Sequence, residues 1–197
     1  MNNQLTGTGV ASDFPVPYRL HQEDFSQALG IGSLDKYENE KSGYMKKCFD
    51  LLRKYSANPI EDQMRLWEIL LFDFLVGNTD NHIKNVSLLY SKSLQSVRLA
   101  PAYDIVSTCI YDASTRDMAI YFGDVCSLDD IDRKAIEQAA AEAAIGKKMA
   151  MSALDRLAGD FESGLSEAAR VLKESGFVQA DQMKEQILAR SGYRNIL

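Results

Sequence analysis

The chain has 197 residues, 46% of them hydrophobic, so it is long enough to bury one substantial core. A formal net charge of −6, with no run of Lys and Arg, argues against a surface that binds nucleic acid directly or an anionic membrane. The three dispersed cysteines, Cys48, Cys109 and Cys126, form no C-x-x-C pair, which argues against a disulfide framework or a zinc site and favours reduced thiols in the cytoplasm. No segment has the length or apolar character of a membrane span or a secretion signal.

The N-terminal part alternates polar segments with one helix. Residues 1–17 are rich in Gly, Thr and Ser and contain two prolines, so we expect a loosely ordered lead-in, with residues 18–197 forming one domain. The pair Glu23-Asp24 is typical of a cap for a helix that starts near Phe25. The segment 35–42 is almost entirely polar and predicts a surface loop, and a helix is expected from about residue 43 to residue 55.

The next segment is the most regular of the chain. Asn58 and Pro59 suit the cap and first position of a helix, and Gly77 supplies a stop. Between them, apolar residues recur at helical spacing: Ile60, Met64, Trp67, Leu70, Leu71 and Phe74. After a short polar loop, the apolar runs 86–90 and 96–99 predict a hairpin of two short strands.

The remainder predicts helices. Ser127 with Asp130 resembles a capping box before an Ala-rich helix that ends near Gly146. Further helices are expected at residues 147–157, 161–174 and 181–189. The fold class is therefore mainly α with a small β-hairpin.

The polar loop after the long helix contains residues of a phosphoryl-transfer site. Asp80 and Asn85 have the D-x-x-x-x-N spacing of a kinase catalytic loop. A carboxylate at the first position can orient an acceptor hydroxyl and take its proton, which assigns Asp80 as the base. An amide oxygen one turn later can bind Mg²⁺ without adding a second charge, which assigns Asn85 as a metal ligand.

A second carboxylate is needed to hold Mg²⁺ against nucleotide phosphates. The returning strand of an antiparallel hairpin ends close to the start of its first strand, so the hairpin brings Asp104 near the loop. Asp104 would stand where a kinase has its D-F-G, without that Phe or Gly. Because D-x-x-x-x-N alone occurs by chance in polar loops, it is the order of helix stop, motif, hairpin and Asp that favours a phosphoryl-transfer site.

Plainer interpretations stand beside these assignments. His82 is a residue that steadies the loop or, with only His21 as a companion, an improbable zinc ligand. Lys84 is interpreted as a solvated loop lysine rather than a phosphate contact. Asp73, a carboxylate in the most apolar helix, is expected to bond to backbone groups of the loop that carries Asp80. Residues 111–117 follow Asp104 where a kinase has its activation segment, and a plain polar loop is the alternative.

Two stretches of the sequence around these candidate site residues resemble a known family over several consecutive positions. Residues 77–85, G-N-T-D-N-H-I-K-N, followed by residues 99–104, L-A-P-A-Y-D, closely resemble the C-terminal domain of HipA-like serine/threonine kinases, toxins of bacterial toxin–antitoxin pairs. Upstream, H-Q-E-D-F at residues 21–25, Q-A-L-G at 27–30 and K-Y-E at 36–38 resemble the passage between the lobes of the same family. The resemblance covers residues 18 to about 110 with specific motifs, and only helical character after Ser127.

The resemblance implies the larger lobe of a protein-kinase-like fold, with ATP and Mg²⁺ as cofactors. It implies that Asp80 is the catalytic base and that Asn85 and Asp104 bind the metal and, through it, the nucleotide. The implied acceptor is a protein Ser or Thr, in a translation factor or aminoacyl-tRNA synthetase, and a helix-turn-helix antitoxin is an implied partner. The Gly-rich loop and ATP-binding lysine of the family's other lobe have no counterpart in the sequence, so we expect the chain alone to be a weak or inactive kinase.

Two other functions remain open at this stage. A small-molecule phosphotransferase shares the base Asp, the ligand Asn and the later metal Asp, although the A-P-A-Y-D string at residues 100–104 fits HipA-like proteins better. A non-catalytic lobe that binds an antitoxin or a separately encoded N-lobe is the alternative from another class.

Overall fold

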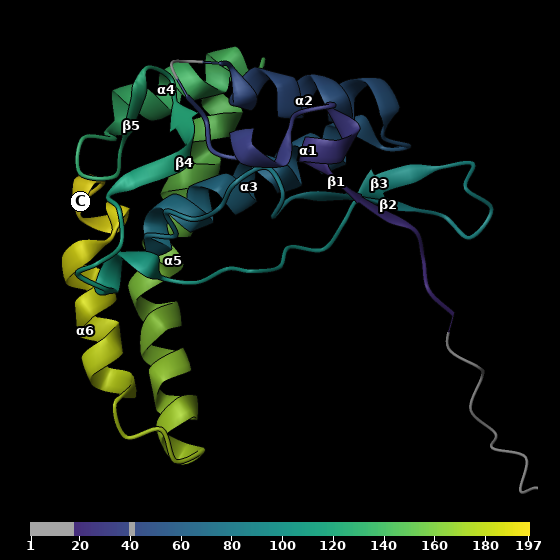
Figure 1. Ribbon diagram of the computed structural model, residues 1–197. Coiled ribbons are helices and arrows are strands. Elements are labelled where there is room, and N and C mark those ends of the chain that lie inside the picture. The colour runs from purple at the N-terminus through teal and green to yellow at the C-terminus, as the bar shows by residue number, and fades with distance from the viewer. Residues whose placement is uncertain (1–17, 40–41) are drawn as a thin grey trace, which may run out of the picture.

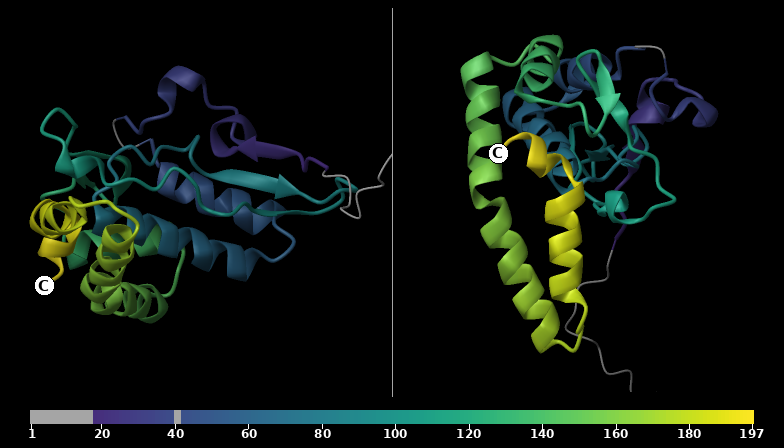
Figure 2. Two further views of the ribbon diagram at one scale, coloured as in Figure 1. Left: turned by 90° about the horizontal axis from the view of Figure 1, so that it is seen from below. Right: turned by 90° about the vertical axis from the view of Figure 1, so that its left-hand side faces the viewer.

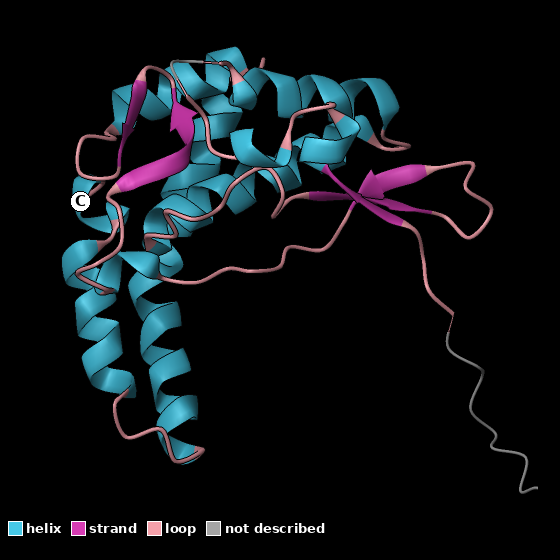
Figure 3. Ribbon diagram, in the orientation of Figure 1, coloured by secondary structure: helices cyan, strands magenta, loops and turns pink. Residues whose placement is uncertain are grey.

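The computed structural model describes residues 18–39 and 42–197, so the predicted lead-in at residues 1–17 lies outside the described part of the chain. The described residues form a mostly helical body with two small antiparallel sheets (Figures 1 and 3). The predicted fold class is confirmed. Among the described residues, no helix combines the length and apolarity needed to cross a membrane.

Helices α2 (Tyr44–Tyr55) and α3 (Pro59–Val76) form as predicted. Pro59 is the first residue of α3, and Gly77 ends the helix in the left-handed region, with φ +74°. The side chains of Trp67 and Phe74 are completely buried, which places α3 at the centre of the core. The indole Nε1 of Trp67 donates to the carbonyl of Ala150, 3.2 Å away, and so ties α3 to α5 (Lys147–Glu174).

The predicted hairpin is present as β2 (Ser87–Tyr90) and β3 (Val97–Leu99), paired with Leu88 opposite Leu99. The sequence did not predict a third strand, β1 (Gln22–Asp24), which pairs with the outer edge of β2. As expected, Asp24 caps the short helix α1 (Phe25–Ala28), and its carboxylate accepts from the backbone of Gln27 at 2.8 Å. Strand β2 begins just after the loop that contains Asp80, so this loop leads directly into the central strand of the sheet.

A second antiparallel pair, β4 (Asp117–Phe122) and β5 (Val125–Ser127), was missed by the sequence analysis. Its signal is the alternation of Met118, Ile120 and Phe122, all of which are buried. The prediction for residues 35–42 as a surface loop was wrong at Glu38, which is only 7% exposed. Its carboxylate accepts from the backbone N–H of Tyr121 at 2.8 Å, so β4 covers it.

The C-terminal helices differ from the prediction in two places. The capping box at Ser127 and Asp130 was wrong, because α4 (Arg133–Glu142) is capped by Asp132, whose Oδ1 accepts from the N–H of Ala135. The two helices predicted over 147–157 and 161–174 are one 28-residue helix, α5. It turns back through residues 175–179 into α6 (Ala180–Arg190), and the two helices lie side by side (Figure 2).

Short 3-10 turns complete the described chain: Ser33–Asp35 before α2, Thr108–Ile110 after the hairpin and Gly192–Asn195 at the C-terminus.

Gly77 combines a left-handed backbone with a close neighbour, since a Cβ at this position would overlap Sγ of Cys109 and lie 2.9 Å from its Cβ. We expect Gly77→Ala to lower the free energy of unfolding by about 3 kcal/mol, from backbone strain and overpacking together. The matched control is Gly43→Ala, at a position with the same φ of +74° where no atom of the described residues lies within 4 Å of the added Cβ. It should lower the free energy by only about 1 kcal/mol. Equal losses in urea unfolding would contradict the packing argument.

Candidate functional site

The loop after α3 closes on itself between Asp80 and Asn85. The backbone N–H of His82 donates to the carbonyl of Asp80 at 2.8 Å, and that of Asn85 donates to the carbonyl of His82 at 2.8 Å. The amide Nδ2 of Asn85 also reaches the carbonyl of Asp80, at 3.1 Å. The spacing read from the sequence therefore corresponds to one compact turn with Asp80 and Asn85 at its ends.

Asp73 holds this turn from the interior of α3. Its side chain is 1% exposed, and its Oδ1 accepts from Nδ2 of Asn78 at 2.8 Å while its Oδ2 accepts from Nδ2 of Asn81. Its backbone carbonyl accepts from the N–H of Asn78 at 2.8 Å. The expected anchoring role is thus present, but the carboxylate engages the two side-chain amides that flank Asp80 rather than loop backbone.

The segment that carries Asp104 runs along the same loop. Asn78 donates through Nδ2 to the carbonyl of Asp104 at 3.2 Å, and its Oδ1 accepts from the N–H of Asp80 at 3.3 Å. The hydroxyl of Tyr103 donates to the carbonyl of Lys84 at 2.8 Å. Beyond it, the N–H of Thr79 donates to Oγ1 of Thr108 at 2.8 Å. One asparagine therefore joins the backbone of Asp80 to the backbone of Asp104.

Asp104 itself is exposed and has φ +57°, a conformation that few residues other than glycine adopt. Burial, opposed by the hydrogen bond from Asn78 and reinforced by the charge of Asp104, raises the pKa of Asp73 to about 7. The same charge opposes the lowering of the pKa of His82. The charge of Asp104 therefore acts on Asp73 in α3 and on His82 in the loop.

His82 lies beneath Lys36, whose ammonium is 2.8 Å from its Nε2. Burial first, and the Lys36 charge second, lower the pKa of His82, so the imidazole is neutral and Nε2 accepts from the ammonium. The contact with Lys36 disfavours a zinc role, because Nε2 already accepts from the ammonium. The steadying role expected for His82 fits these contacts.

Two contacts from residues 36–37 were missed by the sequence analysis. The hydroxyl of Tyr37 donates to Oδ1 of Asp80 at 2.6 Å, and Lys36 contacts His82 as described. The K-Y-E string was noted for its resemblance, but no periodicity or spacing linked it to a loop more than forty residues away. Lys84, expected to be solvated, donates to Oγ of Ser33 at 3.2 Å.

The donor set at this site consists of oxygen ligands. Because Nδ2 of Asn85 donates to the carbonyl of Asp80, its Oδ1 is the atom available to a ligand. The amide oxygen of Asn85 and the carboxylate of Asp104, the two expected metal ligands, are hard oxygen donors, the kind that Mg²⁺ prefers. The residues present therefore fit a magnesium ion.

The sequence matches the family described as HipA-like C-terminal domain over residues 9–165. The chain belongs to this family. Protein Y4mE of Sinorhizobium fredii, which carries the name of a kinase, is 36% identical over 86% of this chain and 39% of its own length. The serine/threonine-protein kinase toxin HipA of Shewanella oneidensis is 28% identical over 87% of this chain and 42% of its own length.

The fold is also that of HipA. The structure of Shewanella oneidensis HipA with HipB and operator DNA superposes with a TM-score of 0.78 at 23% identity, over 95% of this chain and 46% of that chain. This likeness supports the kinase-like C-lobe fold. The HipA-like chain described here spans about two fifths of the length of these curated relatives.

Substitutions that exchange the Asp73 carboxylate with a partner amide test whether Asp73 holds the loop. In Asp73→Asn, one acceptor becomes a donor that faces Nδ2 of Asn78 or Asn81. We expect a loss of about 3 kcal/mol in the free energy of unfolding, because a buried donor is left unsatisfied. In Asp73→Asn with Asn81→Asp, the donor and acceptor are exchanged, and we expect at least about 1 kcal/mol to be recovered.

The matched control is Asp73→Asn with Asn78→Asp. It should recover nothing, because the carboxylate introduced in place of the Asn78 amide has no N–H to donate to the carbonyl of Asp104. Urea unfolding of the four proteins at about pH 8, where the Asp73 carboxyl with its pKa of about 7 is ionised and accepts at both oxygens, measures these differences. Equal recovery in the two double variants would show that the network does not distinguish the two asparagines.

The raised pKa of Asp73 also predicts a pH dependence. The folded-state pKa of about 7 lies above that of an unfolded Asp, so the folded chain retains this proton while the unfolded chain has lost it. The stability from Asp73 is complete below about pH 4 and falls as the pH rises toward 7, by up to about 1.4 kcal/mol per pH unit. The difference in unfolding free energy between wild type and Asp73→Asn should follow this trend. A difference that is constant from pH 4 to pH 7 would refute it.

Proposed function

We propose that the chain contributes the catalytic loop and magnesium ligands for transfer of the ATP γ-phosphate to a Ser or Thr of a protein. The observation that carries the proposal is the junction at Asn78. It joins the turn with Asp80 and Asn85 at its ends to the segment that presents Asp104. Phosphoryl transfer needs little beyond such positioning and electrostatic stabilisation.

Asp80 is the proposed base. Oδ1 of Asp80 accepts from Tyr37, and among the described residues no donor contacts its Oδ2. Oδ2 can therefore accept the proton of an acceptor hydroxyl as that oxygen bonds to phosphorus and ADP leaves. Asn85 through Oδ1 and Asp104 through its carboxylate would hold Mg²⁺. When bound, the ion neutralises charge on the phosphate oxygens.

The proposed setting is the cytoplasm, and the proposed partners follow the relatives. The structure of Shewanella oneidensis HipA contains HipB and operator DNA, which supports an antitoxin partner for this chain. The translation factor or aminoacyl-tRNA synthetase acceptor rests on family resemblance alone. Since the chain spans about two fifths of its relatives, the activity of those longer proteins is carried over only as a proposal.

The test combines nucleotide binding with transfer. We expect Mg-ATP to bind the wild-type chain, and Asp104→Ala to weaken this binding at least about tenfold in calorimetry, through loss of one metal ligand. We expect Asp80→Asn to retain binding but to lower radiolabel transfer to a protein acceptor about 100-fold or more. Asp160→Ala, an exposed carboxylate on α5, is the control for loss of one negative charge.

The same assay separates the rival functions. Transfer to sugars or aminoglycosides but not to protein would favour a small-molecule phosphotransferase. Mg-ATP binding that is identical in wild type and Asp104→Ala would overturn the metal assignment. Absence of transfer by the chain alone, with transfer after a family N-lobe is added, would identify the chain as the dependent half of a kinase.

A further inference from the structure

Three consecutive residues, Lys36, Tyr37 and Glu38, attach the segment before α2 to the rest of the molecule. Oε1 of Glu38 accepts from the backbone N–H of Gly43 at 2.7 Å and of Tyr44 at 2.9 Å. Its Oε2 accepts from Tyr121, and its own N–H donates to the carbonyl of Ala119 at 2.9 Å. This end of the segment is therefore fixed between the start of α2 and strand β4.

The side chain of Tyr37 is held on two sides although it is 40% exposed. Its ring packs edge-on against His82, with centroids 5.3 Å apart and an interplanar angle of 77°. The ammonium of Lys36 lies 4.7 Å from the centre of the ring and contacts Nε2 of the same histidine. Lys36 and His82 thus bracket the phenol, and its hydroxyl points at Asp80.

The hydrogen bond from Tyr37 is the one restraint on the Asp80 carboxylate among the described residues. Asn78, His82 and Asn85 bind only backbone atoms of Asp80, which leaves its side-chain torsions undetermined. Bonding to Asp80, followed by burial, raises the pKa of Tyr37, so the phenol keeps its proton and donates throughout the neutral range. A catalytic group that is free to rotate loses much of its effect.

We propose that Tyr37 is a positioning residue for Asp80, holding Oδ1 so that Oδ2 is presented to the acceptor hydroxyl. Lys36 and His82 in turn hold Tyr37. The proposal rests on the proposed function, because it takes Asp80 to be the base. It adds a residue outside the catalytic loop, 43 positions away in the sequence, to the machinery of transfer.

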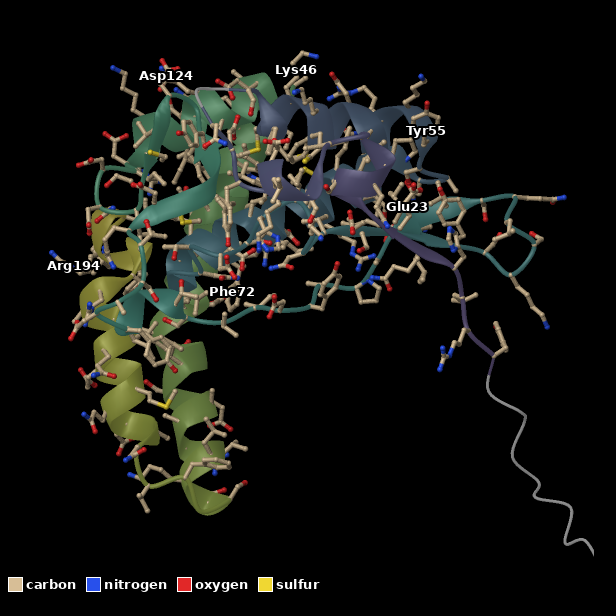
Figure 4. The ribbon with its side chains drawn as sticks, viewed as in Figure 1. Glu23, Lys46, Tyr55, Phe72, Asp124 and Arg194 are labelled. Atoms are coloured by element: carbon tan, nitrogen blue, oxygen red, sulfur yellow. The ribbon has the colours of Figure 1, made fainter. Side chains whose placement is uncertain are left out.

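Tyr37→Phe removes the hydroxyl and keeps the ring. We expect kcat for transfer to a protein acceptor to fall about tenfold while KM for ATP is unchanged, because the base is misoriented but the nucleotide site is intact. The matched control is Tyr90→Phe. Tyr90 makes a similar bond, 2.7 Å to Oε2 of Glu23, at the three-stranded sheet, where Figure 4 labels Glu23. It should leave both constants unchanged.

Three outcomes would overturn the proposal. An unchanged kcat in Tyr37→Phe means that the hydroxyl does not position the base. An increased kcat means that the phenol blocks the acceptor. Phosphate found on Tyr37 by mass spectrometry of the wild-type chain after incubation with Mg-ATP means that the phenol is itself an acceptor.

A measurement without turnover separates this proposal from the proposed function. With ¹³C-labelled tyrosine rings, NMR titration should show a lower pKa for Tyr37 in Asp80→Asn than in wild type, closer to the ordinary value of 10.0. Glu23→Gln should lower the pKa of Tyr90 and leave that of Tyr37 unchanged. A Tyr37 pKa that is unchanged in Asp80→Asn overturns the contact. A lowered pKa in a chain that transfers no phosphate even after a family N-lobe is added overturns the kinase assignment instead.

Discussion

The arrangement of the site depends on one buried carboxylate, Asp73, in the most apolar helix of the chain. A carboxylate with 1% exposure must be hydrogen-bonded, and helix α3 offers it no donor of its own. The two amides of Asn78 and Asn81 supply the donors, one to each oxygen. The hydrogen bonds to the Asp73 carboxylate therefore fix Asn78 and Asn81, which lie on the two sides of Asp80. The geometry of the loop thus follows from one buried polar group in the helix.

Asn78 extends the same constraint to the second segment of the site. Its amide nitrogen donates to Asp73 and to the carbonyl of Asp104, while its oxygen accepts from the N–H of Asp80. An aspartate at position 78 would have no N–H to donate to Asp73 or to the carbonyl of Asp104. An apolar residue there could make none of the three hydrogen bonds. Such contacts maintain the left-handed backbone conformation of Asp104. Asn78 thus couples the proposed base, Asp80, to the proposed metal ligand, Asp104, through hydrogen bonds to the backbone of each residue.

What the sequence predicted well depends on contacts between residues near each other in the chain. Helix α3, its Gly77 end and the β2–β3 hairpin follow from caps, periodicity and turn residues. The helices expected at 147–157 and 161–174 leave a break around Gly159, because Gly disfavours a helix by about 1 kcal/mol. Burial of Leu154 and Phe161 against the core outweighs this, and the ring of Phe161 packs edge-on against that of Phe72, with centroids 6.2 Å apart. The proposed site residues follow from motif spacing, but the Tyr37 contact depends on how β4 and α2 fix Glu38, which no local pattern encodes.

Most side chains of the loop G-N-T-D-N-H-I-K-N, residues 77–85, are held by contacts within the protein. Gly77 leaves room for Cys109, Thr79 pairs with Thr108 at 2.7 Å, and Ile83 is completely buried. Against this background, Asp80 retains Oδ2 and Asn85 retains Oδ1 without a donor from the described residues. In an ordinary surface loop, polar side chains are solvated and have no fixed orientation. Here the contacts made by their neighbours hold these two oxygens at the ends of one turn, and this is the property that the proposed phosphoryl-transfer site needs from a catalytic loop.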